Sequence, residues 1–197
     1  MLSHPPDASP RRISGEPGMW LFVLADVTLF AFAFGAFLYD RGKNPVSFAA
    51  GNAELHLWIG AVDTIILLTT SLVVALAVRN HRRGEPSLAS RLVMTAVIGA
   101  GLFAMFKAIE WGSLIGAGDV PVYGDDFFAY FFALTGLHFL HLVIGVVVLL
   151  VLRTQVAAGA EPAAARTPTV EVCANYWHLV DLLWLIIFPL VYIMPSI

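Results

Sequence analysis

The sequence predicts an all-α integral membrane protein, a bundle of five transmembrane helices, from three observations. Hydrophobic residues make up 59% of the 197 residues and charged residues only 13%, whereas soluble domains have about 25% charged residues. The mean hydropathy is high, at +0.81. Five apolar runs are each long enough to cross a bilayer, which takes about 20 residues of helix: they are roughly Met19–Tyr39, Leu55–Val78, Leu88–Ser113, Phe127–Leu152 and Val172–Met194.

The segments between these runs are short and rich in turn-forming residues. Asp40–Pro45 follows the first run, Arg79–Pro86 follows the second, and the glycine-rich segment Gly116–Asp126 follows the third. None is long enough for a soluble domain of ordinary size. We therefore expect one transmembrane domain over residues 18–197, preceded by a proline-containing mobile cytoplasmic tail at residues 1–17.

The basic residues predict the orientation in the membrane. Eight arginines lie before the first run, at the connection between the second and third (counting Arg91 in the first turn of the third), or between the fourth and fifth, all on one side. The other side has only Arg41 and Lys43. Basic residues are enriched on the cytoplasmic side of membrane proteins, so this distribution places the N-terminus in the cytoplasm and the C-terminus outside.

Several classes of function find no support in the sequence. Cys173 is the single cysteine, so no disulfide can form within the chain and a thiolate metal cluster is not expected. No phosphate-binding glycine loop, no nucleophile with an adjacent base and no nucleic-acid-binding pattern is visible. The net charge of −3 says little about function, because in a membrane protein the distribution of charge between the two sides of the membrane is what counts.

Ionisable residues inside the apolar runs are the candidate functional residues. Such groups are costly at membrane depth, so they are expected to face the protein interior and to have partners. Residues three apart on a helix lie on nearly the same face, which applies to three pairs. The full set is Asp26, Asp63, Lys107, Glu110, His138, His141, His178 and Asp181.

Depth along the helices suggests which of these residues meet. Asp26 is expected to approach His178 or Asp181 in the cytoplasmic half of the bundle, with His141 close by. A separate group near the outer side is expected to contain Lys107 and Glu110, together with Asp63. These pairings follow from distance along each helix alone.

Three interpretations of these polar residues are open. They can be hydrogen bonds and ion pairs that fix helix packing, members of a proton or ion path, or a metal site made from His138, His141 and His178. Three histidines at membrane depth are fewer than a histidine-rich di-iron cluster needs, and the two groups lie at different depths. We expect a packing role, with no metal and no catalytic residue.

Two motifs in consecutive helices resemble subunit III of the haem–copper oxidase superfamily. Thr135-Gly-Leu-His-Phe-Leu-His141 is similar to that family's Thr-Gly-x-His-x-x-His segment. Glu171, followed by Tyr176-Trp-His-Leu-Val-Asp-Leu-Leu-Trp184, is similar to its Glu…Tyr-Trp-His-x-Val-Asp-x-x-Trp segment, and Glu110-Trp111 is similar to a Glu-aromatic pair in the preceding helix. The resemblance covers about residues 17–195 and adds Glu171, Tyr176, Trp177 and Trp184 to the candidate site.

The resemblance implies a non-catalytic accessory subunit without haem or copper. Such a subunit packs beside the catalytic haem–copper subunit in the bacterial inner membrane, holds phospholipid, and supports the stability or proton access of its partner. The chain departs from the family in having five helices where seven are frequent, Asp26 where glutamate is usual, and Lys107 where glutamine is common.

The first two runs narrow the resemblance. Gly18–Asp26, Tyr39–Pro45 and Ala61–Ser71 look most like the NorE-type accessory branch of nitric oxide reductases. An oxygen-reducing cytochrome oxidase is the other partner that the shared motifs allow. A stand-alone proton or ion transporter is the alternative from a different class.

Overall fold

The computed structural model describes residues 17–116, 126–157 and 163–194. Residues 1–16 of the predicted tail lie outside these ranges. The described elements are six α-helices and a terminal π-helix: α1 Pro17–Lys43, α2 Pro45–Ala53, α3 Leu57–Arg82, α4 Pro86–Gly116, α5 Asp126–Ala157, α6 Ala163–Phe188 and η1 Pro189–Ile193.

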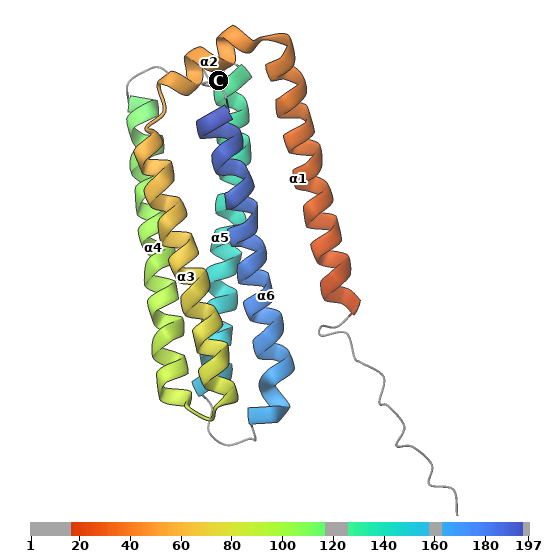
Figure 1. Cartoon of the computed structure of the whole chain (residues 1–197), viewed down its shortest axis with the longest axis vertical. Helices are drawn as coiled ribbons and strands as arrows, with labels where there is room; N and C mark the ends of the chain where they lie inside the picture. The colour runs from red at the N-terminus through yellow and green to blue at the C-terminus, as the bar shows by residue number, and fades with distance from the viewer. Residues whose placement is uncertain (1–16, 117–125, 158–162, 195–197) are drawn as a thin grey trace, which may run out of the picture.

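Five of these segments are long and apolar enough to cross a membrane, which confirms the predicted all-α fold with five spans. They are α1, α3, α4, α5, and the continuous stretch of α6 and η1 from Thr167 to Ile193. The described ranges contain no strand. The long helices run side by side in Figure 1, and chain order alternates their direction.

The bundle consists of a four-helix core and one peripheral helix. The core contacts are those of α3 with α4, α4 with α5, α5 with α6, and α6 with α3. By contrast, α1 stands to one side and touches α5 and α6 only lightly (Figure 1). Apolar side chains therefore cover much of the outside of α1, including Phe32, which is 76% exposed.

The short helix α2 was not predicted. Asp40–Pro45 was interpreted as a turn, but only Asn44 separates α1 from α2, which crosses the end of the bundle (Figure 1). Proline is favoured in the first turn of a helix, where its missing N–H would have no partner anyway, and Pro45 occupies that position. Buried Phe48 of α2 packs edge-on against Phe37 and Phe127.

The last span begins earlier than predicted and changes its helix type before its end. α6 begins at Ala163, nine residues before the predicted start at Val172. At Pro189 the helix becomes a π-helix, because proline has no backbone N–H to continue the α-helical bonding. The side-chain Nδ2 of Asn52 on α2 donates to the carbonyl oxygens of Val191 at 2.8 Å and of Tyr192 at 3.1 Å, which ties η1 to α2.

Two glycines allow neighbouring helices to approach closely. A Cβ on Gly99 of α4 would lie 2.3 Å from the Thr70 methyl carbon of α3. A Cβ on Gly145 of α5 would lie 3.2 Å from the ring of Trp177 on α6. Small residues have this role in membrane bundles, where close backbone packing replaces the hydrophobic driving force of water.

Candidate functional site

A buried charged cluster lies near the end of the bundle that carries α2 and η1. Lys107 and Glu110 are one turn apart on α4, and Lys107 Nζ donates to Glu110 Oε2 at 2.7 Å. Asp63 of α3 places Oδ2 3.2 Å from the same ammonium nitrogen. The structure thus brings together the three residues that were expected to form the outer group.

Tyr192 of η1 completes this cluster. Its hydroxyl group lies 2.8 Å from Lys107 Nζ and donates to Glu110 Oε2 at 2.7 Å. The sequence analysis did not identify Tyr192, although it follows Trp184 by two helical turns and so lies on nearly the same face. Asn52 positions it by holding the carbonyl group of the same residue.

The cluster is isolated from both water and lipid. Each charged side chain is at most 1% exposed, and the ring of Trp184 lies 4.5 Å from the ammonium group. One ammonium group faces two carboxyl groups, and a buried charge without a counter-charge is strongly destabilising. The residues of α3, α4 and η1 therefore depend on one another, so the cluster joins three helical segments at one point.

A second polar pair lies in the other part of the bundle. His141 Nε2 of α5 is 2.8 Å from Asp26 Oδ1 of α1, and His141 Nδ1 is 2.7 Å from the carbonyl oxygen of Leu137. The carbonyl oxygen of Leu137 can only accept, so His141 Nδ1 carries a proton and donates it; the bond between Nε2 and Asp26 needs a second proton, on Nε2 or on the carboxyl group. Asp26 is 6% exposed, and this pair is a buried polar link between α1 and the core; nearer the α2 end, Tyr130 of α5 donates to Asp40 and Arg41 donates to the carbonyl oxygen of Met194.

The expected pairing of Asp26 with His178 or Asp181 is therefore wrong, whereas His141, which was expected close by, is the partner. Position along a helix gives the depth of a side chain, but the rotation of each helix about its axis decides which neighbour it faces. The structure gives His178 a different partner, Ser71 of α3, whose Oγ is 2.7 Å from the ring Nδ1. Asp181, one turn further along α6, is buried, with 4% of its surface exposed.

His138 was expected to have a bonding partner, yet it packs among rings. It is fully buried, and neither ring nitrogen has a hydrogen-bond partner in the part of the chain that the structure describes. The ring of Phe103 lies 5.6 Å away and that of Trp184 lies 5.2 Å away. Both rings also contact the ammonium group of Lys107, so aromatic packing lies between His138 and the charged cluster.

The three histidines proposed as metal ligands therefore have separate environments. His138 is packed against rings, His141 faces Asp26, and His178 faces Ser71. Across residues 17–116, 126–157 and 163–194, no three His, Cys, Asp or Glu side chains are grouped so that they could hold a metal ion.

Of the remaining candidate residues, the aromatic ones pack within the bundle and Glu171 lies at its end. Trp177 and Trp184 are fully buried, so they pack in the interior and do not face lipid. The Trp184 indole N–H donates to Thr64 at 3.0 Å. Tyr176 is half-buried and contacts the ring of Phe22 on α1.

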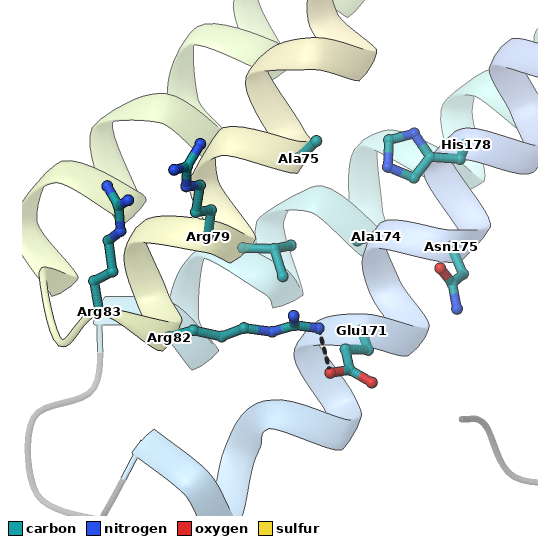
Figure 2. A pocket seen from close by; sticks show the side chains of 9 residues that line it. Ala75, Arg79, Arg82, Arg83, Glu171, Ala174, Asn175 and His178 are labelled. Atoms are coloured by element: carbon teal, nitrogen blue, oxygen red, sulfur yellow. Dashed lines mark hydrogen bonds and ion pairs between the residues drawn. The ribbon is translucent and has the colours of Figure 1, made fainter. Parts of the chain in front are cut away.

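Glu171 was expected among the buried residues, but its side chain is 24% exposed and pairs with Arg82 at 2.6 Å. This pair lies at the bundle end opposite α2, where α3 ends. It forms part of a pocket that the sequence did not indicate (Figure 2).

The geometry defines a class of protein: a five-span membrane bundle in which a buried charged cluster and a histidine–aspartate pair link neighbouring helices. Comparison with known proteins gives the family. The model of the family "Cytochrome c oxidase subunit III" matches residues 13–196, nearly the whole chain. The chain belongs to the cytochrome c oxidase subunit III family, a family of non-catalytic subunits of haem–copper oxidases.

Curated relatives show the same relationship. The chain is 30% identical to cytochrome bo(3) ubiquinol oxidase subunit 3 of Pseudomonas putida, over 90% of this chain and 84% of that protein. It is 29% identical to cytochrome c oxidase subunit 3 of a Synechocystis species, over 90% of this chain and 74% of that protein. It is also 26% identical to a heme-copper oxidase subunit I+III of Aeropyrum pernix, over 89% of this chain but only 22% of that longer protein.

Proposed function

We propose that this chain is the non-catalytic subunit III of a haem–copper oxidase or reductase complex in the bacterial inner membrane. It supports its catalytic partner by packing and by bound phospholipid. The observation that carries the proposal is that two groups of buried polar residues pair across helices, Lys107 with Asp63, Glu110 and Tyr192, and His141 with Asp26. The charged cluster joins α3, α4 and η1, and the histidine–aspartate pair joins α1 and α5. Contacts of this kind hold helices in fixed positions, as a structural subunit requires.

The family supports a catalytic haem–copper subunit as the partner. The Aeropyrum relative is named as subunit I+III, which joins the two subunits in a single protein, and this chain matches one part of it. The lightly packed helix α1 and its exposed apolar side chains supply surface that a second membrane subunit can cover. Large exposed apolar surfaces in a bilayer do not by themselves require a protein partner, so the assignment depends on the family.

The narrower proposal is a nitric oxide reductase as the partner. It rests on the segments Gly18–Asp26, Tyr39–Pro45 and Ala61–Ser71, whereas the relatives described above are named as oxidases. A nitric oxide reductase complex reduces nitric oxide and an oxidase complex reduces oxygen, so the substrate that the purified complex reduces distinguishes the two partners.

The test is purification of the tagged full-length chain from its own membrane in mild detergent. The proposal predicts a co-purifying haem-containing subunit in near-stoichiometric amount, and the reduction of nitric oxide or of oxygen by this complex identifies the branch. Deleting the chain should leave the haem spectrum of the partner intact while sustained turnover or yield falls. Loss of haem incorporation would instead indicate an assembly factor, and ion flux through the purified chain alone would indicate a transporter.

A further inference from the structure

The buried charged cluster of α3, α4 and η1 contains more acidic groups than basic ones. Lys107 is its basic residue, whereas Asp63 and Glu110 are both acidic. If all three side chains had their usual charges, the cluster would carry one net negative charge. Each of these side chains is at most 1% exposed, so solvent cannot balance that charge, and a buried charge without a partner is strongly destabilising.

The neighbouring groups do not supply the missing positive charge. Across the described ranges, the salt bridges of Asp63 and Glu110 are with Lys107 alone. From η1, the hydroxyl group of Tyr192 donates to Glu110 as a neutral group. From α5, His138 is separated from the cluster by aromatic rings, and neither of its ring nitrogens has a hydrogen-bond partner among the described residues. The cluster therefore needs one further cation.

A proton is the cation that this site can accept. The two carboxyl groups lie against the same ammonium nitrogen, at 3.2 Å for Asp63 and 2.7 Å for Glu110. When two acidic groups share a site of low dielectric constant, like charges repel and one group is protonated. A metal ion would need more ligands, and the described residues contain no group of three His, Cys, Asp or Glu side chains that could hold one.

The hydrogen bonds indicate which carboxyl group holds the proton. Glu110 Oε2 accepts from Lys107 Nζ and from the Tyr192 hydroxyl group, both at 2.7 Å, and two donors stabilise a carboxylate in its charged form. Neither oxygen of Asp63 has a hydrogen-bond partner in the described part of the chain. Because Asp63 Oδ2 faces the ammonium group at 3.2 Å, Oδ1 is the atom that can carry a proton.

We propose that the cluster is a one-proton binding site, in which Asp63 is a neutral carboxylic acid protonated on Oδ1 and Glu110 is the single carboxylate opposite Lys107. The site is then neutral as a whole, although an ammonium group and two acidic side chains meet in it. The proton is taken up when the chain folds, because an aspartate in an unfolded chain is ionised above about pH 4. This site belongs to the chain itself and does not depend on the identity of the catalytic partner.

Infrared spectroscopy of the purified full-length chain at neutral pH tests the proposal, because a protonated carboxyl group has a C=O stretching band that a carboxylate lacks. The difference spectrum of the wild-type chain and Asp63→Asn should contain one such band. The band should shift when the aspartate carboxyl carbons are carbon-13 and stay in place when those of glutamate are. Asp26 and Asp181 are present in both proteins and cancel. Glu54→Gln is the matched control, exposed at the same bundle end, and should give no such band.

A second variant keeps the test decisive if Asp63→Asn does not fold. In Glu110→Gln, Lys107 faces a single acidic group, which balances its charge only when ionised, so Asp63 should lose its proton and the same band should disappear. A difference spectrum without a protonated carboxyl band would overturn the proposal. A band that shifts with labelled glutamate would place the proton on Glu110 and would overturn the assignment to Asp63.

The pH dependence of unfolding gives an independent measurement of the bound proton. A folded chain that holds one more proton than the unfolded chain becomes less stable as the pH rises. Between about pH 5 and about pH 7, the folding equilibrium constant of the wild-type chain should fall about tenfold per pH unit relative to that of Asp63→Asn or Glu110→Gln. An equal pH dependence in all three proteins would overturn the proposal, and it would leave co-purification with a haem-containing subunit unaffected.

Discussion

Replacement of Lys107 by methionine gives the strongest test of the buried cluster. Methionine has a similar volume, so the change removes the ammonium group and leaves little cavity. The ammonium nitrogen has three polar contacts, at 2.7 Å to Glu110, 2.8 Å to Tyr192 and 3.2 Å to Asp63. Polar contacts between helices in a bilayer contribute about 1 kcal/mol each or less, and removing one member of a buried ion pair costs about 3–5 kcal/mol.

We therefore expect Lys107→Met to lower the free energy of unfolding by about 3 kcal/mol. The measurement is reversible unfolding of the purified chain in mixed micelles, followed by circular dichroism. Ile109→Met is the matched control, because Ile109 lies on the same helix and is 55% exposed to lipid; its effect should stay within about 0.5 kcal/mol.

A combined variant checks the electrostatic reason for this loss. Adding Asp63→Asn and Glu110→Gln removes the two acidic side chains that Lys107→Met leaves without an ammonium partner. A neutral group of similar shape is often tolerated where a buried ion pair stood, so the triple variant should recover at least about half of the lost stability. A loss below about 0.5 kcal/mol for Lys107→Met, or no recovery in the triple variant, would refute the reasoning.

The remaining predictions concern helix packing and the second polar pair. Gly99→Ala should lower the free energy of unfolding by about 1–3 kcal/mol, because its Cβ would lie 2.3 Å from a threonine methyl carbon. Gly101→Ala is the control and should not destabilise the chain, since nothing lies within 4 Å of its Cβ position. Thermal unfolding compares the two variants, and equal effects would contradict the close approach of α3 and α4. Asn52→Ala removes both bonds to η1 and should cost about 1–2 kcal/mol in the same assay; an unchanged midpoint would show that the tether is dispensable. In a double-mutant cycle with Asp26→Asn and His141→Ala, the two changes should be non-additive by at least about 0.5 kcal/mol; strict additivity would mean that the pair does not form.

The fold could be predicted from the sequence because hydropathy and length determine which segments cross a bilayer. The same reasoning missed α2, since Pro45 and Asn44 are typical both of turns and of helix starts, and nine residues are too few for a hydropathy signal. It also placed the start of α6 too late, because the alanine- and proline-containing stretch before Val172 is not apolar enough to indicate a membrane helix.

In the candidate site, contacts within one helix could be predicted from the sequence, and contacts between helices mostly could not. The pair Lys107–Glu110 could be predicted because both residues lie on one helix, where spacing determines the shared face. The partner of Asp26 could not be predicted, because depth leaves the rotation of α1 undetermined. The bond of Tyr192 to Glu110, and the pocket beside Arg82 and Glu171, form where segments distant in the sequence meet at the two ends of the bundle. The periodicity of a single sequence does not show which segments meet there.

The most direct test of the central claim is the composition of the complex that purifies with the tagged chain. The account predicts a haem-containing catalytic subunit in near-stoichiometric amount, with haem absorbance that is unchanged when the chain is deleted and with turnover that declines faster without it. Purification of the chain alone, without haem, together with proton or ion flux through liposomes that contain only this protein, would contradict the account.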